Sequence, residues 1–407
     1  MTQSPTALRV EIARVLGDLD MHRDAWNSLA ARSPQQLPML SHAWTATYLE
    51  KALPPGSRWA CFFAYRGPTL VAVLPVVTRQ VTRLGVSALA LRTPRDDHTQ
   101  IGDLLFASID DLDAVPAVLS VLGEEFPNVA YLEINRFPET SPLFEALRGN
   151  APLGPHTWRD DSLGAYLPIP REFASYRNSL SRNFRNNLNK ARNKVATLRG
   201  VELRFTGART TSQEDFSEFL NAEASGWKGQ AGSAIAKSPQ LVEFYVTLVR
   251  HLGEVGWLEW QFLTGDGCTL AANLAIRMPK SLVIWKLGYN DAYSRCSPGS
   301  VLFEELVKHE VATQEIKEIN LTTNQPWYDN WEMRRRTYYT ARFYFGWRGW
   351  LIWYLPDAGT NLLRRLTALA AIKRWRRRSV QEPSKVELGD AKSGRKHRKA
   401  TAPTPDP

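Results

Sequence analysis

The stretch that decides the fold is WKLGYNDAYSRCSPGS, residues 285–300. Its first residues continue an apolar run that predicts a strand over 281–289. A polar loop follows, and the run SPGS then begins a predicted helix over 299–314. The small residues at such a helix start expose backbone N–H groups that can hold a pyrophosphate. An ordinary N-terminal cap gives the same pattern, so this stretch alone leaves both interpretations open.

The neighbouring sequence predicts alternating strands and helices. Two of the strand-like runs flank the sequence GDG, which is typical of a hairpin turn. In chain order, the predicted elements of this half are strand 201–206, helices 212–226 and 238–254, strands 257–264, 269–277 and 281–289, helix 299–314 and strand 316–321.

The first half of the chain shows part of the same order. Apolar runs within 59–81 flank the sequence RGP and predict a hairpin, and 129–135 predicts a short buried strand. Helical spacing is found at 23–31, 41–53 and 111–126. We therefore expect an α/β (α+β) fold with two tandem copies of one domain, each a mixed twisted sheet flanked by helices. The aromatic run that starts at Tyr338 is expected to complete the sheet.

A basic segment lies between the two halves. From Glu172 to Glu202 it holds seven basic residues and no acidic residue between these two glutamates. Its apolar residues are three or four apart, as on one helix face. The other faces carry Arg182, Arg185, Lys190, Arg192 and Lys194. A solvated helix joining two domains, which a charged outer face normally indicates, and an anion-binding face both fit.

Most of the net positive charge lies toward the end of the 407-residue chain. The net charge is +10, of which +9 lies from Arg364 onward. The nearly neutral remainder argues against nucleic acid as a partner. Trp347, Trp350, Trp353 and Tyr354 precede the basic residues, a pattern typical of a segment lying on an anionic membrane. We expect a peripheral contact at the inner face; in the alternative, the tryptophans pack into the last strands.

Several classes of site are excluded. Cys61, Cys268 and Cys296 are too scattered for a disulfide framework or a zinc site. The sequence has no Walker P-loop, no GxGxxG after a strand, no GxSxG and no HExxH. The first twenty residues contain no continuous apolar stretch, and the apolar run at 349–355 is too short to cross a bilayer, so we expect a cytoplasmic protein.

Four segments together resemble a known family. They are the basic helix at 176–195 and the runs EASGWKGQAGSA (223–234), WKLGYNDAYSRCSPGS (285–300) and NLTTNQPWYDNW (320–331). In this order they are similar to the CelD-type branch of the GNAT acetyltransferase superfamily, associated with cellulose and exopolysaccharide biosynthesis. The resemblance spans about residues 20–345 and implies tandem GNAT-like domains, an acyl-CoA donor such as acetyl-CoA, and no metal. The chain also resembles the FemAB peptidyltransferases, which share the tandem fold but take aminoacyl-tRNA.

The pattern departs from the family at three points. Arg295 precedes Gly299 by four residues, Asn320 stands where an Asp is frequent, and Trp327-Tyr328 replaces a Tyr-Lys pair. The expected division is a GNAT-like domain at 1–165, a basic connecting helix at 172–200, a GNAT-like acyltransferase domain at 201–356, a basic helix at 357–378 and a disordered tail at 379–407.

GNAT chemistry is direct attack by an amine or hydroxyl on a thioester carbonyl. It needs a base, a group that stabilises the oxyanion and an acid for the leaving thiolate. Glu223 is the candidate base, with Glu259 as the alternative, although either fits a surface carboxylate. Lys286, costly in mid-strand unless paired, serves a structural ion pair or the site. Tyr289 is the candidate acid or a packing residue. Strand alternation puts Trp285, Leu287 and Tyr289 on one face and Ile284, Lys286 and Gly288 on the other.

The resemblance also suggests the binding residues. Ser297, Gly299 and Ser300 are expected to hold the donor. Trp227 and Lys228, in a Gly-flanked loop, are expected to form the wall of a substrate cleft. Three functions stay open: an acyl-CoA-dependent transferase for a sugar amine or hydroxyl, a FemAB-like transferase that uses tRNA, and a non-catalytic assembly partner of a polysaccharide machine. The basic helix favours tRNA, whereas the nearly neutral body disfavours it.

Overall fold

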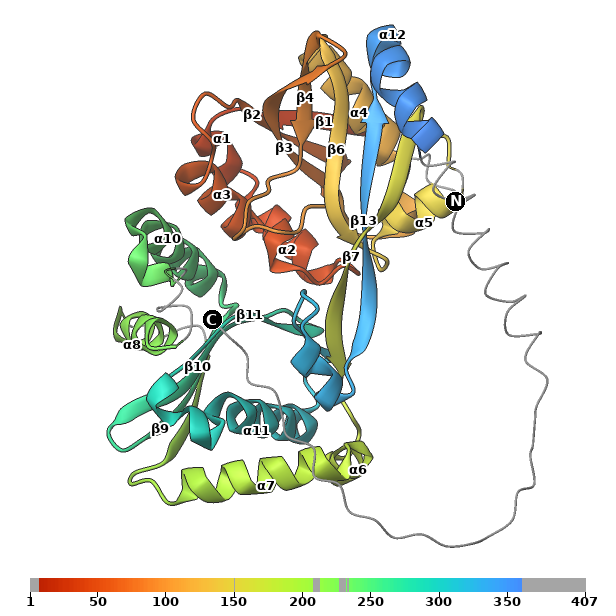
Figure 1. Cartoon of the computed structure of the whole chain (residues 1–407). Helices are drawn as coiled ribbons and strands as arrows, with labels where there is room; N and C mark the ends of the chain where they lie inside the picture. Colours follow the sequence, from red (N-terminus) through yellow and green to blue (C-terminus); the bar gives the residue numbers. More distant parts are fainter. Residues whose placement is uncertain (1–6, 150, 208–212, 227–231, 233, 361–407) are drawn as a thin grey trace, which may run out of the picture. The chain divides into compact units, whose positions relative to one another are not determined.

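The computed structural model describes residues 7–149, 151–207, 213–226, 232 and 234–360. Within these residues, Figure 1 shows a mixed sheet flanked by helices. The described residues up to Ala358 form one compact unit. The predicted tail at 379–407 and most of the basic helix at 357–378 lie outside the described residues.

The strands form one mixed sheet in the order β1-β2-β3-β4-β6-β13-β7-β12-β11-β10-β9-β8, and β5 pairs with β3 off this path. Their bounds are β1 Leu8–Ala13, β2 Trp59–Arg66, β3 Thr69–Arg83, β4 Val86–Arg92, β5 Leu105–Phe106, β6 Val129–Pro138, β7 His156–Pro168, β8 Glu202–Gly207, β9 Leu258–Gly265, β10 Cys268–Arg277, β11 Ser281–Tyr289, β12 Glu318–Asn320 and β13 Arg334–Tyr344.

Helices cover both faces of the sheet in each half (Figure 1). Those used below are α1 Leu16–Asp20, α2 Arg23–Arg32, α3 His42–Lys51, α4 Ala114–Glu125, α5 Pro142–Arg148, α6 Phe173–Ser179, α7 Arg182–Ala196, α8 Gln213–Ala224, α10 Pro239–Val255, α11 Pro298–Thr313 and α12 Gly346–Arg348, with short 3₁₀ turns η4 Ile235–Lys237, η5 Asp291–Cys296 and η6 Pro326–Trp331, and the π-helical turn η7 Gly349–Tyr354. Serine N-caps fix the starts of α3, α7 and α10, because each side chain accepts a backbone N–H: Ser41, Ser181 and Ser238.

The predicted duplication is confirmed by the topology. Each half runs strand, helices, three antiparallel strands, helix and a strand parallel to the third of them: β4 pairs with β6 in the first half, as β11 pairs with β12 in the second. The last strands are exchanged. β7, from the first half, pairs with β12, whereas β13, from the second, pairs with β6, and the two run antiparallel to each other between the halves (Figure 1).

Three segments differ from the expectations. The basic segment at 172–200 is two helices rather than one, because Leu180 is extended and Ser181 caps a new start. The strand at 156–168 was not predicted, since its exposed charged residues hide the alternation. The aromatic run completes the sheet only as far as Tyr344, and the chain turns helical from Gly346, whose φ of +59° favours glycine.

The basic side chains of α7 face away from its buried stripe of Leu188, Ala191 and Val195. Several basic side chains of this segment make protein contacts, such as Arg177 to Glu304 at 2.8 Å and Lys194 to the Arg295 carbonyl at 2.8 Å. Among the described residues, no helix is both long and apolar enough to cross a bilayer.

Candidate active site

One cavity of about 730 Å³ opens where β11 ends and α11 begins. Six of the predicted site residues line it: Glu223, Lys286, Tyr289, Ser297, Gly299 and Ser300. Part of the segment that follows β12 also lines it, including Trp327 and Tyr328. Trp227 and Lys228 lie outside the described residues. Segments far apart in sequence therefore meet at one cavity whose size suits a ligand.

A β-bulge in β11 shapes the wall of this cavity. Lys286 pairs with Leu274 and Ile284 pairs with Ala275, so Trp285 has no partner on β10. Because of this bulge, the strict alternation predicted for the side chains of β11 is wrong. Ile284 and Leu287 pack with Phe303 of α11, whereas Trp285 and Lys286 both lie toward Tyr245 of α10. The extra residue moves Trp285 to the face that simple alternation gives to Lys286.

Two glycines let α8 approach the end of β11 closely. A Cβ at Gly288 would lie 2.8 Å from the backbone N and Cα of Glu223, and one at Gly226 would lie 2.9 Å from the Tyr289 carbonyl oxygen. Such distances exclude any side chain at either position. The close approach brings Glu223 to the cavity, where its buried carboxylate accepts the Ile235 N–H at 2.8 Å.

The start of α11 presents backbone N–H groups without a side-chain cap. Ser297, the N-cap residue, has φ 46° and ψ 51°, a left-handed conformation that is strained for serine, and its side chain makes no capping hydrogen bond. Ser300 and Val301 donate their N–H groups back to the Ser297 carbonyl, and Pro298 has none. Within the described part of the chain, the Gly299 N–H makes no hydrogen bond. Ser297 therefore does not cap this helix through its side chain.

Open space surrounds Gly299. A Cβ built on it would meet no atom within 4 Å. A free N–H at the positive end of a helix of 16 residues, next to open space, can accept an anion such as a pyrophosphate as a hydrogen-bond partner.

Comparison with known proteins agrees with this geometry. Residues 182–329 match the family model described as acetyltransferase (GNAT) domain. This part of the chain is therefore similar to GNAT acetyltransferase domains. The match indicates that the protein is a transferase, and GNAT enzymes in general take acyl-CoA as co-substrate.

Solved structures are similar over most of the chain. FemX matches with a TM-score of 0.58 and 9% identity, covering 84% of this chain and 100% of that chain. A conserved protein of unknown function from Bacteroides thetaiotaomicron VPI-5482 matches with a TM-score of 0.50 and 12% identity, covering 82% of this chain and 100% of that chain. A tandem GNAT protein from the clavulanic acid biosynthesis pathway has a TM-score of 0.44 and 14% identity, covering 82% and 98%. No curated protein matches the sequence. At these identities the first two similarities show the fold alone.

Two aromatic rings lie near Lys286 at this cavity. Its Nζ lies 5.8 Å from the centroid of the Tyr245 ring and 5.6 Å from that of Trp285, within cation–π range. The Tyr245 hydroxyl lies 2.9 Å from Nδ1 of His98, which belongs to the first half. Burial raises the pKa of Tyr245 well above its usual value, so this phenol stays protonated. The ammonium of Lys286 is thus held at the cavity by a fixed aromatic wall.

The first half of the chain contributes Gln100 to the cavity, which the sequence analysis did not identify. Arg136, nearly buried and with a φ of 51°, donates to Gln100 Oε1 at 2.9 Å and to the Thr322 carbonyl at 3.0 Å. Its Nε donates to Ser162 at 2.9 Å. Gln100 and Thr322 both line the cavity, so one guanidinium ties its first-half wall to its second-half wall.

A polar chain runs from the cavity into the sheet. Asn273, which lines the cavity, donates to Gln261 at 2.9 Å, and Gln261 donates to Glu259 at 2.8 Å. Glu259 is paired with Arg277 at 2.6 Å and is absent from the cavity lining. The alternative base is therefore placed in an ion pair within the sheet. An asparagine within the apolar run TLAANLAIR was a signal that could have pointed to Asn273.

The tyrosines of the cavity differ in their surroundings. Tyr289 is half-buried and packs with Val301 and Ala271. Tyr328 is buried and its hydroxyl lies 3.0 Å from Oγ1 of Thr323, and burial raises its pKa. A phenol hydroxyl can donate a hydrogen bond, and both tyrosines line the cavity.

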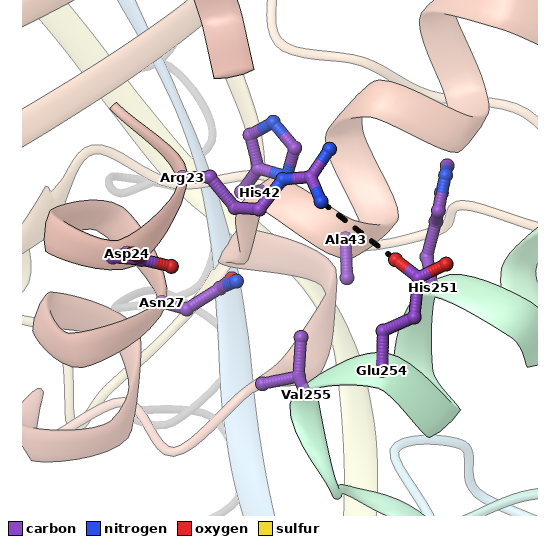
Figure 2. A pocket seen from close by; sticks show the side chains of 8 residues that line it. All are labelled: Arg23, Asp24, Asn27, His42, Ala43, His251, Glu254 and Val255. Carbon is purple, nitrogen blue, oxygen red and sulfur yellow. Dashed lines mark ion pairs between the residues drawn. The ribbon is translucent and has the colours of Figure 1, made fainter. Parts of the chain in front are cut away.

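A second cavity, of about 390 Å³, lies between α2–α3 and α10 and holds none of the predicted site residues. Figure 2 shows Arg23 and Glu254 directed toward each other, 3.7 Å apart, and Arg23 also donates to Asp20 at 2.6 Å. Burial lowers the pKa of His42 to about 4, so its imidazole is neutral at neutral pH. The one arginine that lines this cavity is thus paired with carboxylates of the protein itself, in contrast to the free N–H at α11.

Proposed function

We propose that the chain is an acyl-CoA-dependent acyltransferase, most simply an acetyltransferase, acting on an amine or hydroxyl of a saccharide or other small acceptor. The resemblance to the CelD-type branch supports a place in cell-envelope or exopolysaccharide biosynthesis. One observation carries the proposal: the free N–H of Gly299 at the start of α11 lines the same cavity as Glu223, Lys286 and Tyr289.

The donor binds at the start of α11 and along β11. The Gly299 N–H and the helix dipole bind the pyrophosphate, and the hydroxyls of Ser297 and Ser300 add donors. The bulge leaves the backbone of Trp285 without a ladder partner, and that peptide can bind the amide-containing arm of coenzyme A. This arrangement directs the thioester toward Lys286 and Tyr289.

The chemical step follows from the groups at that end. The carboxylate of Glu223 takes a proton from the acceptor while the amine or hydroxyl attacks the thioester carbonyl. The Lys286 ammonium stabilises the negative charge that develops on the carbonyl oxygen. When the C–S bond breaks, the Tyr289 hydroxyl gives its proton to the leaving thiolate. The acyl group is then joined to the acceptor and coenzyme A is released. Trp227 and Lys228 are proposed to hold the acceptor.

The fold shared with FemX favours one second candidate, a transferase that takes aminoacyl-tRNA. Thermal unfolding of the full chain with coenzyme A, acetyl-CoA or tRNA separates the two, because a ligand that binds only the folded state raises the melting temperature. We expect coenzyme A and acetyl-CoA to raise the melting temperature and tRNA to leave it unchanged. A melting temperature that rises with tRNA alone would mean that the donor is aminoacyl-tRNA and not acyl-CoA.

A further inference from the structure

The helical segment after β13 is fixed on one side and exposed on the other. Trp353 is buried against the sheet, its ring centroid 6.5 Å from that of Tyr131. Asp357 accepts hydrogen bonds from Arg83 and Arg342, both at 2.8 Å. The inward side of this segment is therefore held by packing and by ion pairs.

The outward side presents large apolar residues to solvent. Trp347 is 69% exposed, Trp350 43%, Leu351 50% and Leu355 41%. Spacings of three, one and four residues place them along one helical face, which we call the aromatic face. Leu84, 85% exposed at the β3–β4 turn, is next in sequence to Arg83, which binds Asp357. Gathered exposed apolar side chains of this size mark an interaction surface.

The sequence that follows the aromatic face carries the complementary signal. Residues 361–378 contain seven arginines and lysines and no acidic residue, and Arg348 lies within the face itself. A partner must accept apolar rings and neutralise many cations at once. An anionic lipid bilayer does both, since Trp rings lie at the head-group level and basic residues are attracted to anionic head groups.

We propose that the aromatic face and the basic segment at 361–378 dock the protein on the surface of an anionic bilayer. No residue of the aromatic face lines the cavity, so this proposal does not depend on acyl transfer. Trp353 keeps the helix attached to the sheet while the aromatic face enters the head-group layer.

Co-sedimentation of the full chain with vesicles tests the proposal. Vesicles of phosphatidylglycerol and phosphatidylcholine are compared with vesicles of phosphatidylcholine alone at low ionic strength. One variant removes the apolar contact, and its control changes exposed apolar residues elsewhere: Trp347→Ser/Leu351→Ser/Leu355→Ser against Met21→Ser/Val246→Ser. A second pair compares equal losses of charge: Arg374→Gln/Arg376→Gln/Arg377→Gln/Arg378→Gln against Lys392→Gln/Arg395→Gln/Lys396→Gln/Arg398→Gln.

We expect the full chain to sediment with the anionic vesicles only. The Arg374–Arg378 variant should lower the partition coefficient by at least about tenfold, since each basic residue near the surface contributes about fivefold. The serine triple variant should also lower it by at least about tenfold, because it removes the apolar side chains that would enter the head-group layer. The two control variants should change it far less. Protein that stays in the supernatant, or a triple variant that sediments like the wild type, overturns the proposal. A dimer in light scattering that the triple variant abolishes also overturns it, because a second copy then covers the aromatic face.

Discussion

The two halves of the chain use equivalent strands differently. After β11, a short 3₁₀ turn leads directly to α11, whose start offers a free N–H. After β4, the equivalent strand, residues 93–113 intervene before α4. This loop is tied to β6, for Thr93 and Gly102 donate to the carbonyls of Glu133 and Asn135 at 3.0 and 2.8 Å.

This difference indicates that the two copies of the fold have different roles. The loop after β4 presents Gln100 to the cavity of the other half instead of forming an anion site of its own. We infer that the second half binds the donor and performs the chemistry, whereas the first half completes the wall.

The largest effect is expected at Glu223. Replacing it by Gln keeps the shape and removes the proposed base, so the rate of transfer should fall by about 10²–10⁴. Chromatography of coenzyme A released from acetyl-CoA measures this rate. Glu254→Gln, in the second cavity, is the matched control and should leave the rate unchanged. Equal rates for the two variants would remove Glu223 from the mechanism.

Alanine should destabilise the protein at one glycine of the cavity and leave its stability nearly unchanged at another. At Gly288 the new Cβ would lie 2.8 Å from the backbone of Glu223, so Gly288→Ala should lower the free energy of unfolding by about 1–3 kcal/mol. At Gly299 the space is open, so Gly299→Ala should change the free energy of unfolding by less than about 0.5 kcal/mol. Urea unfolding measures both. Comparable losses at the two positions would contradict the described approach of α8 to β11.

Arg136 should act on acceptor binding through Gln100 and Thr322. Arg136→Met is expected to raise the KM for the acceptor about tenfold. Without the guanidinium, Gln100 and Thr322 are no longer held together, and the cavity wall binds the acceptor less well in both the ground state and the transition state. Affinity for acyl-CoA should not change. Arg95→Met is the control, since Arg95 donates to Asn135 and not to Gln100. A variant that loses donor and acceptor affinity together would mean that Arg136 acts on the fold as a whole.

The smallest effect is expected in the second cavity, from His42. Burial and Arg23 lower its pKa to about 4, whereas the unfolded chain binds this proton near pH 6.5, so stability falls as pH drops through that window. Asp20 opposes the shift and His251 reinforces it.

Lowering the pH from about 7 to about 6 should cost less than about 1 kcal/mol through His42. Asp103, whose pKa burial raises to about 7, titrates in the opposite sense, so the test compares the wild type with His42→Gln. The difference between their unfolding free energies should change with pH over this range. A constant difference would mean that His42 keeps its ordinary pKa.

Local signals predicted the strand and the helix that carry the proposed donor site. The strand over 281–289 and the helix start after it lie within one continuous stretch, so short-range patterns located Tyr289 and Gly299. Glu223 came from a helix whose boundaries are also local. The resemblance supplied the roles that spacing alone left open.

The long-range contacts could not be predicted from the sequence alone. The exchange of β7 and β13 pairs residues more than a hundred positions apart. The sequence of neither strand indicates which strand it pairs with. The bulge at Trp285 depends on the register with β10, so strict alternation put that side chain on the wrong face. Gln100 reaches the cavity only because Arg136 and the loop after β4 are folded around it.

Calorimetric titration of acetyl-CoA into the full chain tests the central claim most directly. Gly299→Glu places a carboxylate in the open space beside the proposed pyrophosphate site without a clash against the protein. The account predicts binding by the wild type and by Gly299→Ala, and no detectable binding by a folded Gly299→Glu variant. Unchanged affinity in Gly299→Glu would contradict it and move the donor away from the start of α11.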